Sequence, residues 1–366
     1  MFDKVQESLK KSKDERQKKR LEKERVRLEK AAAEAVREKE RLQQEAEKIQ
    51  AEKDRLLSLD DKGLMVVSLS GCGEKSTTLT VFNWFDYIDE DVIKMFEQET
   101  GIKVNYTNFT TNEEMFAKLE KGSGSYDVIF PSDYIIERMI KEDMLAELDL
   151  SKMPNVANLV DWCKKPDYDP DCKYSVAYMW GTVGILYNTE KVDGEVTSWS
   201  SLFDPAYERG VFMLDSIRDS FCVGLKYLGY SLNTQEEEAL SAVKELLLKQ
   251  KEDGIVAGYL VDETKDKMIA GEAAMAVMWS GDALYAMEGN DKLAYVVPEE
   301  GSNVWIDGMC IPKSSKNQEA AMKFIDFMCR PDIAEKNQDY IYYSSPVQQV
   351  IDGYTDEEKA EEALNP

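Results

Sequence analysis

The chain of 366 residues contains no histidine, no CxxC cysteine pair and no apolar run of 18 residues. Without histidine, Ser-His-Asp and Cys-His catalysis and His-dependent zinc sites are excluded, and the usual side chain for proton transfer near neutral pH is missing. The cysteine spacing indicates neither a zinc ribbon nor a thioredoxin-like motif, and nothing spans a bilayer as a helix. We therefore expect no enzyme, no cofactor and no metal site.

Basic side chains are in the minority, since 46 Lys and Arg against 71 Asp and Glu give a formal charge of −25. Residues 1–62 carry 19 basic and 16 acidic side chains, so the acidity belongs to the remainder, with 27 basic and 55 acidic. This charge argues against nucleic acid or an anionic membrane surface as a partner and suits a cationic ligand. Cys163 and Cys172 could meet across a loop, but the cysteines after Cys72 read mainly as small buried side chains with free thiols.

Residues 1–62 lack Pro, Gly, Trp and Tyr and are dense in good helix formers, which predicts one long charged α-helix. Apolar side chains recur every seven residues from Leu21 to Leu56, as in one seam of a heptad repeat. The companion seam, three residues earlier in each repeat, is mostly charged. The pattern therefore favours a lone or weakly self-associating helix over a stable coiled coil.

Residues 63–76 contain Leu69-Ser70-Gly71-Cys72, which resembles the lipobox of a bacterial lipoprotein signal peptide and would make Cys72 a lipidation site. The apolar stretch before Cys72 is shorter than a signal-peptide core and follows a long charged segment. We interpret residues 63–76 as a signal remnant and linker; the alternative is a short buried strand.

From residue 77 on, β-rich runs alternate with amphipathic helical runs. Strands are expected over Leu79–Trp84, Ile102–Tyr106, Tyr126–Phe130, Gly181–Tyr187, Val211–Leu214, Ala273–Met278, Ala294–Val297 and Gly308–Ile311. Helices are expected from the cap Asp89 to Gly101, from a capping box of Thr111 and Glu114, and over Asp133–Leu145, Gln235–Lys251 and Asn317–Met328. The opening βαβαβα order predicts a parallel sheet, and the length fits two α/β lobes.

Aromatic, acidic and hydroxyl side chains gather where these strands end, which is where open α/β sheets bind ligands. They are Trp84, Asp86, Tyr87, Ser132, Tyr134, Ser216, Asp219, Trp279, Asp282, Trp305 and Asp307. Carboxylates accept charge-assisted hydrogen bonds from ammonium groups, and aromatic faces attract a cation by roughly 0.5 to 2 kcal/mol. Each of these residues alone is more often a core or capping residue. Their repeated coincidence predicts a site for an organic cation.

At these positions the chain resembles the polyamine-binding substrate-binding proteins of bacterial ABC transporters. The resemblance runs through the motifs Phe-Asn-Trp-Phe-Asp-Tyr at 82, Tyr-Asp-Val-Ile-Phe-Pro-Ser-Asp-Tyr at 126, Val-Met-Trp-Ser-Gly at 277 and Trp-Ile-Asp at 305. It implies a two-lobed, periplasmic-binding-protein-like α/β fold of type II behind the charged helix. Lobe 1 would comprise 77–184 and 304–352 and lobe 2 would comprise 185–303, with 353–366 as a truncated C-terminal segment.

The resemblance also implies roles for individual residues. The aromatic box around the ligand's aliphatic chain would be Trp84, Tyr87, Trp279 and Trp305, with Tyr343 as a further wall. The amine-binding acids would be Asp86, Asp219 and Asp307, and Ser132 with Tyr134 would bond one terminus. Ser216 stands where the spermidine-binding pattern has Asp, whereas Asp282 follows the putrescine-binding pattern, so we expect putrescine to bind as tightly as spermidine or more tightly.

The function implied is a non-catalytic receptor that closes its lobes on putrescine or spermidine and delivers it to a membrane ABC permease. It would work outside the cytoplasm, in the periplasm or as a lipoprotein anchored to the cell membrane, touching the membrane only through its lipid. Two alternatives stay open. One is a receptor of the same fold for another small solute, and the other is a helical structural or scaffold protein, suggested by residues 1–62.

Overall fold

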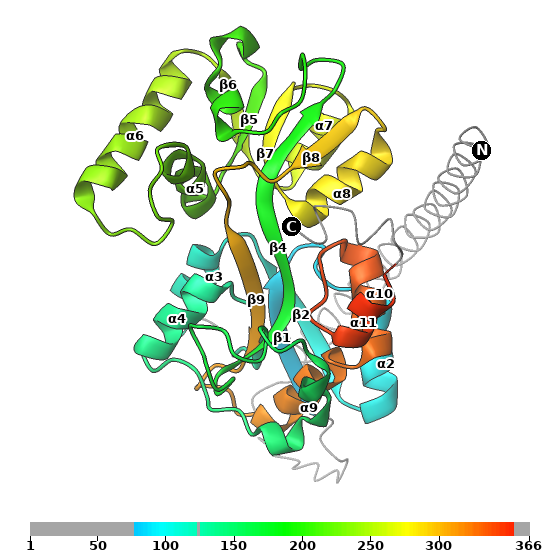
Figure 1. Ribbon diagram of the computed structural model, residues 1–366. Helices are drawn as coiled ribbons and strands as arrows, with labels where there is room; N and C mark the ends of the chain where they lie inside the picture. The colour runs from blue at the N-terminus through cyan, green and yellow to red at the C-terminus, as the bar shows by residue number, and fades with distance from the viewer. Residues whose placement is uncertain (1–76, 123–124, 355–366) are drawn as a thin grey trace, which may run out of the picture. The chain divides into compact units, whose positions relative to one another are not determined.

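The computed structural model describes residues 77–122 and 125–354 (Figure 1). The chain divides into two units, Met1–Glu74 and Lys75–Pro366, and the described residues belong to the second. The helix expected over 1–62, the lipobox at Cys72 and the segment from residue 355 on lie outside the described residues. Among the described helices, none combines the length and the apolar character needed to cross a membrane.

The described part forms two lobes in Figure 1, which confirms the two-lobed α/β expectation. The first lobe begins with the parallel strands β1 (Thr78–Trp84), β2 (Lys103–Phe109) and β3 (Val128–Ile129). Its helices are α2 (Glu90–Thr100), α3 (Asn112–Glu120), α4 (Asp133–Lys141), α9 (Gln318–Met328), α10 (Pro331–Ile341) and α11 (Gln348–Asp352). Short 3₁₀ helices, η1 (Leu150–Lys152) and η2 (Pro154–Asn158), precede its last strand.

The helix ends of the first lobe follow the signals in the sequence. Asp89 caps α2 by accepting from the backbone N–H of Asp91, and Gly101 ends that helix at a φ of 71°. Thr111 caps α3 by accepting from the N–H of Glu114. The predicted capping box is wrong in one detail, because the Glu114 carboxylate accepts from Thr110 instead of from the Thr111 N–H.

The two lobes share one pair of antiparallel strands, β4 (Ser175–Asn188) and β9 (Val304–Cys310). Their register runs from Ser175 opposite Cys310 to Thr182 opposite Val304, and Figure 1 shows β4 passing from one lobe into the other. With β5 (Val211–Leu214), β6 (Val256–Leu260), β7 (Met275–Trp279) and β8 (Leu293–Val296) of the second lobe, the sheet order is β2-β1-β3-β9-β4-β7-β5-β6, and β8 also pairs with β4.

Three sequence expectations need correction here. The parallel order predicted for the opening strands is confirmed for β1, β2 and β3, but the whole sheet is mixed, because β9 and β4 run antiparallel to their neighbours. The strand expected over Gly181–Tyr187 extends over Ser175–Asn188. Its ends were missed because a strand buried on both faces has no alternating pattern of apolar and polar residues. The strand expected over Gly308–Ile311 begins at Val304, so Trp305 and Asp307 lie within it. The predicted lobe boundaries fall inside β4 and at the start of β9 and stay a prediction.

The second lobe carries β5 (Val211–Leu214), β6 (Val256–Leu260), β7 (Met275–Trp279) and β8 (Leu293–Val296). Its helices are α5 (Ile217–Tyr227), α6 (Glu237–Glu252), α7 (Glu263–Ile269), α8 (Ser280–Gly289) and the 3₁₀ helices η3 (Trp199–Phe203) and η4 (Pro205–Tyr207). In Figure 1, α5 and α6 lie on one side of the strands, and α7 and α8 on the other.

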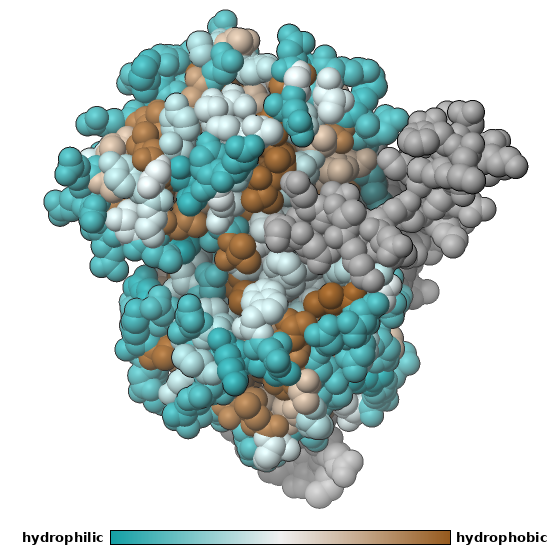
Figure 2. Space-filling view, in the orientation of Figure 1, coloured by the Kyte–Doolittle hydropathy of each residue, from teal (hydrophilic) through white to brown (hydrophobic). Residues whose placement is uncertain are grey.

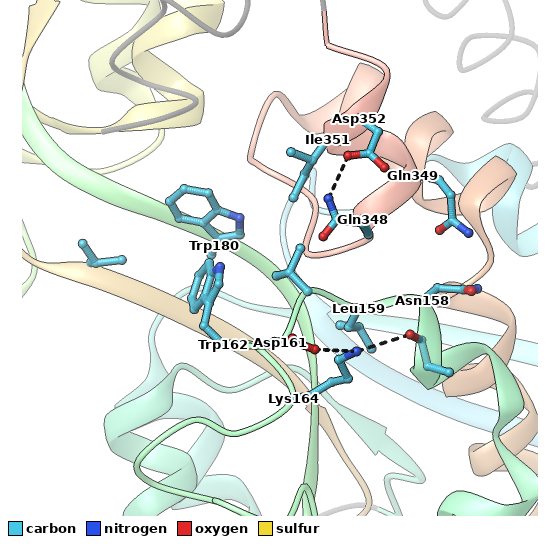
Figure 3. Close-up of a pocket in the computed structure, with 13 residues that line it drawn as sticks. Asn158, Leu159, Asp161, Trp162, Lys164, Trp180, Gln348, Gln349, Ile351 and Asp352 are labelled. Carbon is cyan, nitrogen blue, oxygen red and sulfur yellow. Dashed lines mark hydrogen bonds and ion pairs between the residues drawn. The ribbon is translucent and has the colours of Figure 1, made fainter.

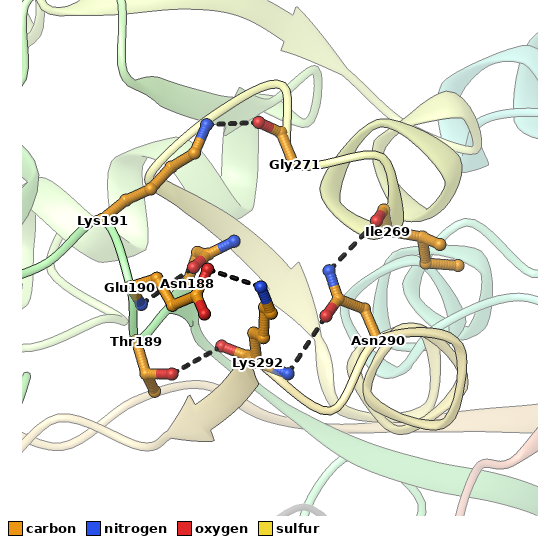
Figure 4. A network of polar contacts seen from close by, with 8 residues as sticks. All are labelled: Asn188, Thr189, Glu190, Lys191, Ile269, Gly271, Asn290 and Lys292. Atoms are coloured by element: carbon orange, nitrogen blue, oxygen red, sulfur yellow. Dashed lines mark hydrogen bonds and ion pairs between the residues drawn. The ribbon is translucent and has the colours of Figure 1, made fainter.

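The far end of β4 is tied to the helices of the second lobe by polar contacts (Figure 4). Lys191 donates to the carbonyl of Gly271 just after α7, and Lys292 forms an ion pair of 2.6 Å with Glu190. Asn290, after α8, donates to the carbonyl of Ile269 at the end of α7 at 3.1 Å. These contacts fix the C-terminal end of α7 against its neighbours.

The five described cysteines, Cys163, Cys172, Cys222, Cys310 and Cys329, are all buried free thiols, which confirms their reading as small core residues. Cys163 and Cys172 are therefore not bonded to each other, and the Cys172 thiol lies 3.1 Å from the Lys164 carbonyl. On the face shown in Figure 2, hydrophilic side chains cover most of the described surface and apolar ones form small groups among them. Such a surface agrees with the acidic composition after residue 62.

Candidate functional site

Asp307 is the centre of one group of the predicted site residues. It is 5% exposed and accepts hydrogen bonds from the Tyr87 hydroxyl at 2.8 Å and from the Ser132 hydroxyl at 2.6 Å. The backbone places Ser132, which is the residue immediately before α4 and forms an isolated β-bridge with Asp307 in β9. Asn112 donates to both Ser132 and the Tyr134 hydroxyl, at 3.0 and 3.1 Å. Four predicted residues thus lie together at the end of β3.

Asp219 is the centre of a second group, in the second lobe. Ser216 caps α5, and its hydroxyl donates to the Asp219 carboxylate at 2.8 Å. The Trp279 indole N–H donates to the same carboxylate at 3.2 Å, and the Asn303 amide at 3.3 Å. Asp219 is 7% exposed. All the hydrogen bonds that this carboxylate accepts from described residues therefore come from neutral donors.

Three aromatic rings, those of Tyr87, Trp305 and Tyr343, form a wall beside these groups. The ring of Tyr343 lies 5.1 Å from that of Trp305 and 5.6 Å from that of Tyr87, both at steep angles. Two glycines give these rings their space, because a Cβ at Gly181 would lie 2.7 Å from the Trp305 ring, and one at Gly281 would lie 2.6 Å from the Tyr343 ring. A wall of three aromatic rings suits the methylene chain of a ligand.

Buried charge sets the electrostatics of this region. Burial raises the pKa of Asp307 to about 7, partly offset by its hydrogen bonds from Ser132 and Tyr87, and the nearby Asp133 and Asp219 raise it further. Burial likewise raises the pKa of Asp219 and of Asp133. In the described part of the chain, neither Asp219 nor Asp307 forms an ion pair with Lys or Arg. Carboxylates buried in this way are stabilised by an added cation.

The two lobes meet at these groups. The guanidinium of Arg218, on α5, lies 5.1 Å from the centre of the Tyr134 ring on α4, and its charge lowers the pKa of Asp133. Asp133 in turn accepts from the backbone N–H of Ile306, which lies between Trp305 and Asp307. Residues of both lobes therefore border the region of buried carboxylates.

Asp282 lies apart from both carboxylates. It is in the first turn of α8 and forms an ion pair of 3.2 Å with Lys265. Burial, followed by the charge of Asp282, raises the pKa of the Tyr343 phenol. Asp282 therefore touches the aromatic wall while already holding a cation.

Trp84 and Asp86, like Asp282, are predicted residues that these contacts do not bring into either group. The Trp84 ring packs against Phe109 at 4.6 Å, and its indole N–H donates to the carbonyl of Phe130 at 2.8 Å. Asp86 lies in the turn after β1, at a φ of 49°, and is exposed. Its charge reaches across to Lys265, whose pKa it helps to raise.

A cavity of about 1070 Å³ lies elsewhere, on the opposite face of β4 and β9 (Figure 3). Trp162, Trp180 and Val304 are among its lining residues, and the rings of Trp162 and Trp180 lie 5.2 Å apart. It contains none of the twelve predicted site residues. Asp161 forms an ion pair of 3.0 Å with Lys164, and Asp352 accepts from the neutral amide of Gln348 at 2.8 Å. The buried carboxylates, around which the predicted residues gather, are therefore the candidate site.

Sequence reasoning missed the residues that support the site. Asn112, Asn303 and Lys265 each contact a predicted side chain from a different element. Asn112 follows the predicted cap Thr111, so its position at the start of a helix was the available signal. Asn303 and Lys265 carry no local signal, because their partners are far away in the sequence.

Two α/β lobes joined by continuous strands, with buried carboxylates and aromatic rings where the lobes meet, define a solute-binding receptor rather than an enzyme. The chain belongs to the family described as bacterial extracellular solute-binding protein, whose model matches residues 91–365. This membership confirms the expectation of a non-enzymatic receptor and of a fold that works outside the cytoplasm.

Relatives support the assignment. The chain is 35% identical over 287 residues to the spermidine/putrescine-binding periplasmic protein of Salmonella typhimurium, which covers 78% of this chain and 82% of that protein. It is 32% identical over 302 residues to the putrescine-binding periplasmic protein PotF of Escherichia coli, with 77% and 81% covered. The crystal structure of the spermidine/putrescine ABC transporter substrate-binding protein PotD from Streptococcus pneumoniae matches with a TM-score of 0.70 at 38% identity, covering 80% of this chain and 90% of that chain.

Proposed function

We propose that this protein is a polyamine receptor, which binds putrescine or spermidine between its lobes and presents it to a membrane ABC permease. The observation that carries the proposal is the pair of buried carboxylates, Asp219 and Asp307, neither of which forms an ion pair with Lys or Arg among the described residues. Burial raises the pKa of Asp219, and the nearby charge of Arg218 opposes this rise only in part. Ammonium groups of a ligand would supply the missing cations.

The remaining predicted residues fit the same ligand. Trp279 and Trp305 lie beside the two carboxylates, and Tyr87 and Tyr343 extend the apolar wall. A polyamine offers ammonium groups separated by methylenes, so each charge meets a carboxylate while the chain between them packs against rings. Ser132 and Tyr134 would fix one terminus, and Ser216 would add a neutral hydrogen bond near the other.

Relatives from three organisms support the ligand class, since they are named as spermidine-binding, putrescine-binding or both. Membership of an extracellular solute-binding family supports an extracytoplasmic location and a permease partner. Anchoring through a lipid on Cys72 belongs to this proposal as well. Metabolic labelling with a radioactive fatty acid tests it, since Cys72→Ala should abolish the label.

Isothermal titration of the full chain tests the ligand. The panel is putrescine, spermidine, spermine, cadaverine and choline, with lysine and phosphate as controls. We expect saturable binding of at least one aliphatic polyamine and none of phosphate. Binding of lysine or choline with no polyamine response would favour a receptor for another cation of the same fold, and no response at all would favour a structural role.

A further inference from the structure

Lys265 places an ammonium group of the protein itself beside the proposed ligand site. It stands on α7, and its Nζ lies 3.2 Å from Oδ1 of Asp282 on α8. The side chains are only 21% and 17% exposed, so water screens this pair less than the surface pairs of the chain. The same Nζ lies 5.6 Å from the centre of the Tyr285 ring. Lys265 thus makes with Asp282 and an aromatic ring the contacts that a ligand ammonium would make.

Three carboxylates face this ammonium. Asp282 raises the pKa of Lys265 most, and Asp262 and Asp86 raise it further, against the lowering effect of burial. Asp262 is on the second lobe and Asp86 is in the turn after β1 on the first lobe. Lys265 is therefore a fixed positive charge where acidic residues of both lobes approach each other.

The helix that carries Lys265 is itself held in place. Its end at Ile269 accepts from Asn290, and the next turn is bound to Lys191 through Gly271 (Figure 4). Met268 and Thr264 on the same helix are fully buried, at 0% and 2% exposure. An ammonium on an anchored helix keeps its position better than one on a loop.

We propose that Lys265 is a specificity-determining residue, which occupies Asp282 and leaves the ligand two carboxylates, Asp219 and Asp307. The inference rests on the proposed function. It changes the role expected of Asp282, whose carboxylate would bind Lys265 instead of an ammonium group of the ligand. The neighbouring Asp133 already accepts from the backbone N–H groups of Tyr134 and Ile306. With Asp219 and Asp307 left for the ligand, the site matches two ammonium groups, and the third ammonium of a triamine finds no carboxylate of its own.

The test is the ratio of spermidine affinity to putrescine affinity, measured by titration calorimetry on the full chain. Lys265→Met frees Asp282 for a ligand ammonium, so we expect the ratio to rise about tenfold, because a charge-assisted hydrogen bond contributes roughly 1.5 to 3 kcal/mol. In the double variant Lys265→Met/Asp282→Asn the ratio should fall back about tenfold. Lys267→Met is the matched control, since that lysine stands on the same helix and pairs only with Glu272 in the described structure.

An equal gain in affinity for putrescine and spermidine in Lys265→Met would overturn the inference, because it would show only that a repelling positive charge had been removed. An unchanged ratio would overturn it too. Lys265→Gln gives a second reading, and circular dichroism shows that each variant is folded. If the unmodified chain binds neither amine, the proposed function itself has failed, which the first titration reveals before any variant is made.

Discussion

The hydroxyl of Tyr87 donates a hydrogen bond of 2.8 Å to Oδ2 of Asp307, although 220 residues separate them in the chain. Ser132 occupies the other oxygen of the same carboxylate at 2.6 Å. Hydrogen bonds therefore hold both carboxylate oxygens of Asp307 in place before a ligand binds. The carboxylate needs little rearrangement to accept an ammonium, and this organisation underlies the first two predictions.

Asp307→Ala and Trp305→Ala should each weaken polyamine binding while leaving the fold intact. Loss of the buried charge partner is expected to cost about 2 to 5 kcal/mol of binding free energy, and Trp305 provides part of the apolar wall. Val304→Ala is the matched control, because Val304 is 52% exposed and lies on the opposite face of β9. Titration calorimetry measures the affinities. Unchanged affinity in both folded variants would remove these residues from the site.

Polyamine affinity should rise with pH up to about pH 7 and then level off. A ligand ammonium binds the carboxylate form of Asp307, whose pKa burial raises to about 7. Alkyl ammonium groups keep their proton throughout, since their pKa is about 10.4. Titration at several pH values, in buffers of different ionisation enthalpy, should show proton release below pH 7. Asp307→Asn should lose both effects, and a flat profile in the unmodified protein would contradict the prediction.

The same group should make the ligand-free protein less stable as pH rises. Asp has a pKa of about 3.9 in unfolded chains. Because the folded protein holds the Asp307 proton up to about pH 7, it binds more protons than the unfolded chain between these values. The contribution of Asp307 to the free energy of unfolding is therefore present below about pH 4 and is lost as pH rises through 7. Comparing urea denaturation of the unmodified chain and Asp307→Asn across this range isolates the contribution.

Gly281→Ala should reduce both stability and affinity. The added Cβ would lie 2.6 Å from Cγ and Cδ1 of Tyr343, atoms at the root of the ring that cannot move alone. Overpacking of this kind costs about 1 to 3 kcal/mol. Gly258→Ala serves as the control, since its Cβ would find its nearest atom at 3.6 Å. Thermal unfolding reports stability and calorimetry reports affinity. A Gly281→Ala variant as stable as Gly258→Ala would show that Tyr343 has room to retreat.

Ser216→Asp should shift preference toward spermidine. Ser216 contributes a hydroxyl bonded to Asp219 at 2.8 Å, so an added carboxylate there would offer a third ammonium its partner. Relative affinity should change about tenfold, which is 1.4 kcal/mol. In the unmodified protein we expect putrescine to bind as tightly as spermidine or more tightly. Tenfold tighter spermidine binding without any substitution would show that charge placement is not what sets the preference.

Removal of residues 1–62 should leave ligand affinity within about twofold, roughly 0.4 kcal/mol. The composition of this segment contains no strong apolar face with which to pack on the α/β part. Calorimetry on the shortened and full chains makes the comparison, with circular dichroism as a check of folding. A tenfold loss would show that the segment shapes the receptor.

Local signals in the sequence predicted much of the fold. The caps Asp89 and Thr111 and the stop at Gly101 lie where expected, because capping depends on a few adjacent residues. The length of β4 was underestimated, since a strand buried on both faces has no alternating pattern. The antiparallel return of β9 was missed because pairing of Ser175 with Cys310 is decided by the whole fold.

The site divides in the same way. Strand-end positions singled out Ser132 and Asp219 as ligand-binding residues, which stays a prediction, and the structure places each of them beside other predicted residues. The hydrogen bond between Ser132 and Asp307 requires β9 beside β3, which no local pattern reveals. Lys265 could not be singled out, because one lysine on a polar helix looks like a solvated charge until α8 brings Asp282 to it.

The strand pair that joins the lobes also determines how the chain is partitioned. The backbone N–H of Val183 donates to the carbonyl of Asn303 at 3.1 Å, so everything between these residues leaves and returns at one point of the molecule. The second lobe is thus an insertion whose two junctions coincide. A chimaera that exchanges this insertion with that of a related receptor needs a compatible junction at only one place in the structure. A circular permutant whose new termini lie inside the insertion would keep β4 and β9 of the first lobe continuous.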